Sequence, residues 1–197
     1  MIVVTSPSPV NNEAATINAM FNNGLELLHI RKPYATVKQV RLLIEGIDSR
    51  NHQQLALHQY HEIASDYGLN RLHFKESERL KQSEKQLSAL RQNEFILSTS
   101  VHSWESYYAL IPMFSYAFIG PVFNSISKQG HNAMEHIELC GNNSVKQIAI
   151  GGISKENLDC EIVKTFDGVA VLGAIWLCEQ PLNEFKLLQQ KWITTGR

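Results

Sequence analysis

The sequence predicts an α/β protein in which eight parallel strands alternate with helices and close into a (β/α)8, or TIM, barrel that is compact and has minimal loops. Short apolar runs recur along the whole chain, and each is followed by a polar turn and then by apolar residues at helical spacing. Near the chain's end, the runs 148–150 and 168–172 both stop at glycine. Eight such units favour a closed barrel over an open sheet.

Length and composition predict one domain over residues 1–197, near the lower size limit of roughly 200 residues for such barrels. The net charge of −1 gives no electrostatic basis for a nucleic-acid or anionic-membrane partner. Three cysteines without a C-x-x-C pair indicate a reducing compartment. No apolar run has the length of a membrane span, and the N-terminus lacks signal-peptide character, so we expect a cytoplasmic protein.

The strands are expected where apolar runs end in a polar or glycine-containing turn. Pro33 stops the second strand, because proline cannot donate to a ladder hydrogen bond. The predicted strands are residues 1–5, 25–30, 55–57, 71–74, 95–99, one that contains 118–119, 148–150 and 168–172.

The helices are expected between these strands. Residues 36–47 show the clearest amphipathic spacing, and Ser103 is a predicted N-cap for a helix that begins at Trp104. Three tryptophans, at 104, 176 and 192, lie on expected helices and are predicted to pack in the core. The predicted helices cover residues 11–22, 36–47, a segment containing 63–67, 79–91, a segment from 104, 134–139, the crossover containing 162–166, 174–177 and 181–192.

The glycine-rich turns after the last two strands predict a phosphate site. Gly151 and Gly152 follow the seventh strand, and Leu172 and Gly173 end the eighth. Glycine lets backbone N–H groups turn toward a ligand, and a short helix beginning after Gly173 would direct its positive end to the same place. In barrels of this class, these loops form a standard phosphate site. Gly-Gly also closes many ordinary loops, so the residues alone leave both interpretations open.

Polar side chains follow most of the other strands. In a parallel barrel, the carboxyl ends of all strands share one rim, where these cations, hydroxyls and histidines suit a ligand with more than one phosphate. The rim residues are Arg31, Lys32, His58, Gln59, His73, Lys75, Glu78, Ser100, His102, Ser125, Ser127 and Lys128.

Several segments together resemble one enzyme family. They are HIRKP (29–33), GLNRLHFKE (68–76), STSVHS (98–103), GPVFNSISK (120–128), IAIGGI (148–153) and DGVAVLGAI (167–175). In order and strand position, they resemble thiamine phosphate synthases, a family that includes the related thiazole tautomerase. The similarity spans nearly the whole chain.

The resemblance implies that an aminopyrimidine pyrophosphate is coupled to a thiazole phosphate with release of pyrophosphate. Stabilising the departing pyrophosphate is the protein's main task in that reaction, through Mg2+ and cationic side chains. The resemblance assigns catalytic roles to Arg31, Lys32, Ser100 and Lys128, with His58 as a candidate acid or base. It assigns the substrate phosphate to Ser125, Ser127, Gly151, Gly152, Leu172 and Gly173.

The chain also departs from the family pattern. The family lysine after strand two appears one position early, as Lys32, and would therefore point differently on a strand. His58 and Gln59 replace an Asn-Asp pair whose aspartate holds Mg2+, and Glu78 stands at the second metal position. Since Mg2+ prefers hard oxygen ligands, losing one carboxylate should weaken the site.

These departures keep other functions open. Thiazole tautomerisation needs the phosphate site but no metal, although Pro121 stands where the tautomerase carries a histidine. A replacement acid or base could come from His58, His73 or His102, whose reference pKa suits proton transfer near neutrality. For His73 a structural role is the stronger interpretation, and His58 is equally consistent with a solvated loop residue. A third hypothesis is an inactive barrel that only binds thiazole or thiamine phosphate. In each case, the partners are phosphorylated small molecules, and self-association is possible.

Overall fold

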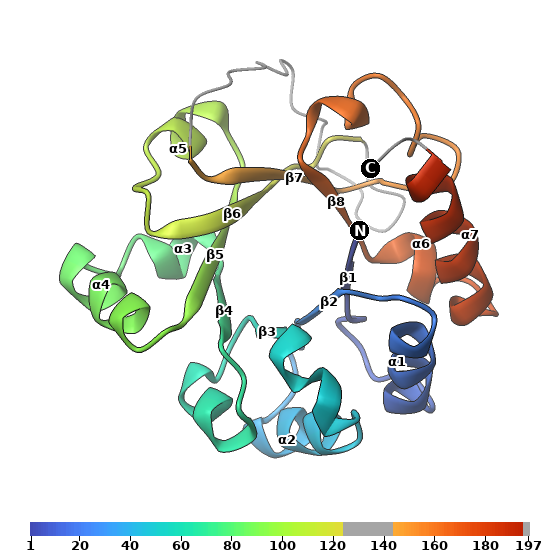
Figure 1. Cartoon of the computed structure of the whole chain (residues 1–197), viewed down its shortest axis with the longest axis horizontal. Coiled ribbons are helices and arrows are strands. Elements are labelled where there is room, and N and C mark those ends of the chain that lie inside the picture. Colours follow the sequence, from blue (N-terminus) through green and yellow to red (C-terminus); the bar gives the residue numbers. More distant parts are fainter. Residues whose placement is uncertain (124–143, 195–197) are drawn as a thin grey trace.

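The structure, a computed structural model, describes residues 1–123 and 144–194. Its eight strands pair in sequence order, and β8 pairs with β1, so the sheet closes into a barrel (Figure 1). Every pairing is parallel. The predicted (β/α)8 fold class is confirmed.

The strands lie where the apolar runs predicted them. The third and fourth strands have the predicted ends, and the others differ by a few residues. Their bounds are β1 Ile2–Val4, β2 Leu27–Ile30, β3 Leu55–Leu57, β4 Arg71–Phe74, β5 Ile96–Val101, β6 Phe114–Ile119, β7 Lys146–Ile150 and β8 Gly168–Val171.

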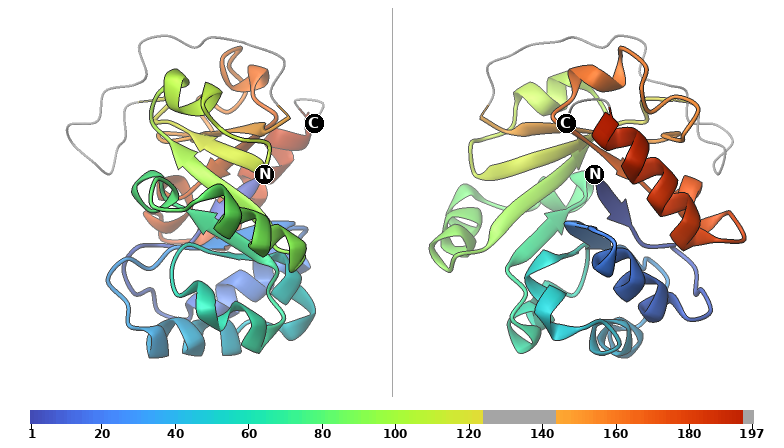
Figure 2. Two further views of the ribbon diagram at one scale, coloured as in Figure 1. Left: turned by 90° about the vertical axis from the view of Figure 1, so that its left-hand side faces the viewer. Right: turned by 45° about the vertical axis from the view of Figure 1, so that its right-hand side comes forward.

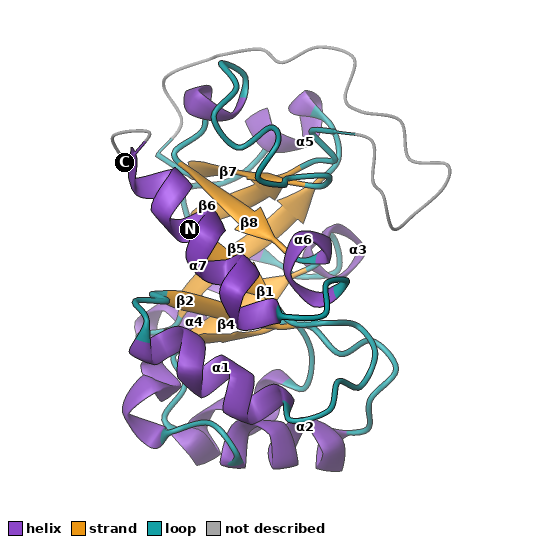
Figure 3. Cartoon of the chain, turned by 90° about the vertical axis from the view of Figure 1, so that its right-hand side faces the viewer, coloured by secondary structure: helices purple, strands orange, loops and turns teal. Residues whose placement is uncertain are grey.

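The helices lie outside the ring of strands (Figure 2). Seen from the side, α1 and α2 run next to each other, and α7 packs on α1 and α6 (Figure 3). Their bounds are α1 Glu13–Asn22, α2 Val37–Glu45, α3 Glu76–Arg79, α4 Glu84–Gln92, α5 Trp104–Tyr108, α6 Gly173–Trp176 and α7 Pro181–Thr194, with 3-10 helices η1 Ser49–Gln54, η2 His61–Tyr67 and η3 Val163–Thr165. No helix within the described ranges has the length and apolar character needed to cross a membrane.

Three helix predictions need correction. The helix predicted through residues 63–67 is a 3-10 helix rather than an α-helix. The predicted helix 79–91 begins only at Glu84, because Ser83 caps it: the Ser83 side chain accepts from the Gln86 N–H, and the Gln86 side chain accepts from the Ser83 N–H. Arg79 belongs to the separate short helix α3. The crossover between β7 and β8 contains only the short η3, and Ile162 there is exposed. The predicted helix 134–139 lies outside the described residues.

Residue alternation along the strands separates the barrel interior from the layer under the helices. Outward-facing residues such as Val3, Leu28 and Leu57 join the large core between strands and helices. A smaller apolar cluster fills part of the barrel interior, and consists of Ile2, Val4, Tyr116, Phe118, Ile148 and Ala170. Because side chains alternate with a period of two, His29 and His73 share the inner face with this cluster.

Candidate active site

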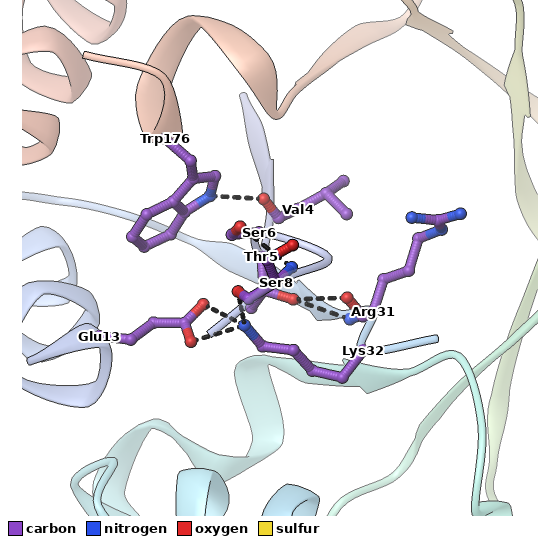
Figure 4. A network of polar contacts seen from close by, with 8 residues as sticks. All are labelled: Val4, Thr5, Ser6, Ser8, Glu13, Arg31, Lys32 and Trp176. Carbon is purple, nitrogen blue, oxygen red and sulfur yellow. Dashed lines mark hydrogen bonds and ion pairs between the residues drawn. The ribbon is translucent and has the colours of Figure 1, made fainter. Parts of the chain in front are cut away.

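Arg31 and Lys32 are adjacent in sequence, but their side chains leave the backbone in different directions (Figure 4). The backbone of Arg31 is fixed by Thr5, whose hydroxyl oxygen accepts from the Arg31 N–H at 2.9 Å. Arg31 lies two residues after the inward-facing His29, and therefore on the same face. Among the described residues, no hydrogen bond or ion pair involves its guanidinium. Arg31 is thus a cation available to a ligand at the barrel mouth.

Lys32 points outward and is buried in an ion pair. Its ammonium lies 2.6 Å from a carboxylate oxygen of Glu13 and also donates to the carbonyl of Ser8 at 3.1 Å (Figure 4). Burial raises the pKa of Glu13, against the opposing effect of the lysine. The partner of Lys32 is therefore a residue of α1. The ammonium proposed for catalysis is therefore occupied, and it does not join Arg31.

Three histidines from β2, β4 and the end of β3 meet inside the barrel. The Nδ1 atom of His29 lies 2.9 Å from the Nε2 atom of His58, a hydrogen-bond distance. The rings of His58 and His73 stack with centroids 4.0 Å apart. On its other side, the Nε2 atom of His29 lies 2.7 Å from the hydroxyl of Tyr116, which comes from β6 across the barrel. His58 is half-buried, so the solvated-loop interpretation is wrong.

The three rings are neutral at physiological pH. Burial lowers the pKa of His29 from 6.5 to about 3. Burial, followed by the other rings and the positive charge of Arg31, holds the pKa values of His58 and His73 well below 6.5. A neutral imidazole offers one lone pair, which can accept a proton or bind a metal ion.

His73 connects this cluster to two serines of β5. Its Nδ1 atom lies 2.9 Å from the hydroxyl of Ser98, and its Nε2 atom lies 2.8 Å from the hydroxyl of Ser100. Ser98 can donate to the carbonyl of Leu72 at 3.4 Å, which leaves its oxygen to accept from the His73 Nδ1–H. His73 Nε2 is then the acceptor for Ser100. His73 therefore orients the serine hydroxyl that the resemblance places in the site.

The glycine turns after β7 and β8 lie side by side. Ile150 is level with Ala170 in the paired strands, so Gly151 and Gly152 approach the turn at Leu172. Both glycines have positive φ, 97° and 65°. A Cβ on Gly151 would lie 2.7 Å from the Cβ of Pro121, so only glycine fits there without displacement.

The turn at Leu172 leads directly into the predicted short helix. Helix α6 begins at Gly173, with Leu172 as its N-cap. The first N–H groups of a helix have no acceptor within it and point outward from its start. Trp176, in the same helix, donates to the carbonyl of Val4 at 2.8 Å and so ties α6 to β1. The two turns that were predicted to hold a phosphate are adjacent, on the same end of the barrel as Arg31.

The positions that the resemblance assigns to Mg2+ do not fit that ion. The carboxylate of Glu78 lies 3.1 Å from Lys81 and 3.6 Å from Lys75, and the hydrogen bond from Lys81 lowers its pKa. Gln59 uses its amide N–H2 to donate to the carbonyl of Lys32. Magnesium favours several hard oxygen ligands, and these two positions supply one carboxylate that is already paired.

The remaining candidates divide into two groups. His102 lies near Glu76, with its Nδ1 atom 2.9 Å from a carboxylate oxygen, and most of its side chain is exposed. Ser125, Ser127 and Lys128 lie outside the described residues. Sequence reasoning missed His29, Tyr116 and Glu13 as partners in the site. The signal for His29 was its position two residues before Arg31, which places both on one strand face.

Comparison with known sequences identifies related proteins. A family model described as thiamine monophosphate synthase matches residues 1–175. A curated thiamine-phosphate synthase from Gloeobacter violaceus is 26% identical over an alignment of 191 residues that covers 92% of this chain and 54% of that protein. The chain thus spans about half the length of the curated relative it matches.

Solved structures with the same fold include two thiamine phosphate pyrophosphorylases. The protein from Bacteroides thetaiotaomicron superimposes with a TM-score of 0.73 and 23% identity, covering 97% of this chain and 96% of the other. The protein from Pyrococcus furiosus gives a TM-score of 0.76 and 18% identity, with coverages of 98% and 95%. At these identities, the likeness shows the barrel fold.

Proposed function

Because the chain belongs to the thiamine monophosphate synthase family, we propose that it is a transferase that couples an aminopyrimidine pyrophosphate to thiazole phosphate. The products are thiamine phosphate and pyrophosphate. The observation that carries this proposal is the adjacency of the two glycine turns at the same end of the barrel as Arg31, whose guanidinium has no hydrogen-bond or ion-pair partner in the described part of the chain. One phosphate and one diphosphate need such a pair of anion sites.

The proposed division of labour follows from this placement. Backbone N–H groups at Gly151, Gly152 and the start of α6 hold the thiazole phosphate. Arg31 stabilises the negative charge that develops as the bond between the pyrimidine methylene and the pyrophosphate oxygen breaks. The thiazole nitrogen then supplies the electron pair for the new C–N bond. Ser100 donates its hydroxyl hydrogen to His73, which leaves its oxygen to accept a hydrogen bond from a substrate N–H. Lys128, Ser125 and Ser127 add contacts that the resemblance implies.

The dependence of the proposed activity on Mg2+ has to be measured. The family resemblance implies Mg2+, whereas Gln59 and the paired Glu78 do not fit it, so we expect a weaker dependence on Mg2+ than two carboxylates would give. Gln59→Asp should raise activity at low Mg2+. An unchanged rate would show that position 59 takes no part in binding the ion.

We further propose that the partners are phosphorylated small molecules and that the protein is cytoplasmic. Self-association remains a testable part of this proposal, since barrels of this size often form oligomers. Light scattering on the eluting peak of a sizing column measures the mass directly, and a value that matches a single chain would contradict it.

The test is turnover by the purified full chain. The chain is incubated with both substrates, once with Mg2+ and once without it. Any thiamine phosphate that forms should be matched by an equal amount of pyrophosphate. Arg31→Ala should lower kcat/KM by about 100-fold, the usual order for losing one charge-stabilising group. Arg50→Ala is the matched control, because Arg50 is a surface arginine that precedes β3 at the opposite end of the barrel.

Two other outcomes would contradict the proposal. Aromatisation of the thiazole tautomer without coupling would assign the chain to the tautomerase reaction. Binding of thiazole phosphate or thiamine phosphate without either turnover would identify an inactive barrel. Product analysis distinguishes the two reactions, and a binding measurement on the same protein preparation identifies the inactive barrel.

A further inference from the structure

Of the His29, His58 and His73 cluster, the proposed coupling reaction uses only His73, and only to orient Ser100. One ring nitrogen of each histidine lies within 4.8 Å of the others. Ring centroids of His29 lie 5.1 Å from those of both His58 and His73. Within the described part of the chain, this is the one group of three or more His, Cys, Asp or Glu side chains with such spacing.

We propose that His29, His58 and His73 bind a divalent transition-metal ion of the zinc type, with one coordination position open toward the barrel mouth. Three imidazoles plus an open position form a common arrangement for catalytic zinc. Nitrogen ligands select ions such as Zn2+, Co2+ and Ni2+ and not Mg2+. This site is distinct from the carboxylate positions that the family resemblance assigns to Mg2+, and it shares His73 with the proposed coupling activity.

Outer partners already set two of the rings for such a role. Histidine ligands generally use their second nitrogen to bond a protein group, which fixes ring orientation. The Nε2 atom of His29 has Tyr116 at 2.7 Å, and its Nδ1 faces His58. Ser98 lies 2.9 Å from His73 Nδ1, which leaves His73 Nε2 as the ligand atom, with Ser100 at 2.8 Å in the place a metal would take.

The third ring supplies the adjustment that binding needs. Tetrahedral zinc–nitrogen bonds of about 2.0–2.1 Å place ligand nitrogens roughly 3.3 Å apart. The His29 Nδ1 and His58 Nε2 atoms, now 2.9 Å apart, must therefore open slightly, while any wider pair, at most 4.8 Å apart, must close. His58 follows β3 directly and is only half-buried, whereas His29 and His73 are fully buried in strands. The His58 ring must rotate so that it no longer stacks on the ring of His73. Its 2.9 Å contact with His29 also requires one N–H, which moves to the other nitrogen of His58 when the metal binds.

The charge state of the cluster supports binding at neutral pH. All three rings are neutral there, because burial lowers their pKa values. Neutral imidazole is the form that binds metal, so no proton has to be displaced into solvent. Arg31 opposes a dication by repulsion. An anion bound in the open position would offset that repulsion, so adding pyrophosphate should tighten metal binding.

The experiment titrates the full chain, freed of metal by EDTA and dialysis, with Co2+ and Zn2+. Bound Co2+ should produce visible d–d absorption that saturates at one Co2+ ion per chain. Zn2+ should abolish this absorption by competing for the site. Zn2+ should raise Tm, because an ion that binds only the folded chain stabilises it, whereas equal Mg2+ should not. Absence of the Co2+ spectrum, or a larger Tm shift with Mg2+, would overturn the proposal.

Variants assign the ligands. His58→Gln should weaken Zn2+ binding by about 100-fold or more, since even loss of an outer partner costs 10–100-fold. Tyr116→Phe, which removes the outer partner of His29, should weaken it by about tenfold. His102→Gln is the control, because His102 is exposed and outside the cluster. Equal Zn2+ affinity in His58→Gln and the unmodified chain would overturn the assignment. Far-UV circular dichroism checks folding, and the metal preference of the unmodified chain is decisive if a variant does not fold.

Discussion

The two halves of the barrel interior differ in chemistry. Strands β1, β6, β7 and β8 contribute the apolar cluster, with Tyr116 as its one hydroxyl. Strands β2, β4 and β5, with the turn after β3, contribute His29, His73, Ser98, Ser100 and His58. One half therefore packs as core, and the other holds polar groups that hydrogen-bond one another and reach the mouth.

The difference shows how one fold combines stability with a site. A fully apolar interior would be more stable but could not bind a charged ligand, and a fully polar one would leave buried groups unsatisfied. Phe118 marks the boundary: its ring lies 4.6 Å from that of His29 and 4.7 Å from that of His73. The apolar half thus supports the polar half directly.

The largest expected effect comes from removing that boundary residue. Phe118→Ala empties a fully buried position and should lower the free energy of unfolding by about 4–5 kcal/mol, through lost burial and the cavity that remains. Urea denaturation measures this. Leu187→Ala on α7 is the control, because Leu187 is 53% exposed, and it should change stability by less than about 0.5 kcal/mol. A loss below about 1 kcal/mol for Phe118→Ala would contradict a packed apolar half.

The second prediction concerns the ion pair of Lys32 and Glu13, which lies outside the barrel interior. Lys32→Met leaves the Glu13 carboxylate buried without its partner and should cost about 3–4 kcal/mol. The double variant Lys32→Met/Glu13→Leu should recover most of this loss, because it removes both charges. Arg50→Gln breaks an exposed pair with Asp48 and should leave the urea midpoint unchanged. If the double variant is no more stable than Lys32→Met, the loss of stability does not come from the unpaired charge of Glu13.

The sequence predicted the strands and the glycine turns well because their signals are local. An apolar run that ends in glycine, such as residues 148–152, can be recognised without knowing which segments pack against it. It also predicted that Lys32, one position early, would point away from Arg31, because alternation along a strand is a local rule as well. The structure confirms that divergence (Figure 4).

The histidine cluster and the Lys32 pair could not be predicted in this way. The cluster depends on the stagger of neighbouring strands: His29 is level with Ala56, yet it contacts His58 two residues further on. Glu13 reaches Lys32 from a helix whose orientation the sequence does not specify. The start of α4 at Glu84 could have been predicted, because Ser83 and Gln86 have capping-box spacing.

The third prediction uses pH to test the neutral state of the polar half. The folded pKa values of His29 and His73 are lowered from 6.5, so the unfolded chain binds more protons as pH falls below 6.5. Stability is therefore full above that value and is lost as pH falls toward the folded pKa, about 3 for His29. Between about pH 7.5 and pH 5.5, the lowered pKa of His29 should cost roughly 1.4 kcal/mol, and the lowered pKa of His73 adds to that loss.

Urea denaturation in EDTA at both pH values measures this loss without bound metal. Glu13 acts in the opposite sense, because burial raises its pKa, so a variant is needed to isolate the histidines. In His73→Gln, the loss should be smaller than in the unmodified chain, because one group with a lowered pKa is removed. An unchanged loss in that variant would assign the pH dependence to other groups.

The smallest expected effect tests a single contact within the polar half. Ser98→Ala removes the partner of His73 Nδ1, and a buried N–H left without an acceptor should cost about 1–2 kcal/mol. Ser115→Ala is the matched control on the neighbouring strand, where the hydroxyl only meets the surface Arg91 at 3.3 Å. Freed from Ser98, His73 can exchange its tautomer, so its orientation of Ser100 weakens as well. Coupling turnover should then fall together with stability in Ser98→Ala, whereas a loss of stability with full turnover would show that Ser98 serves packing alone.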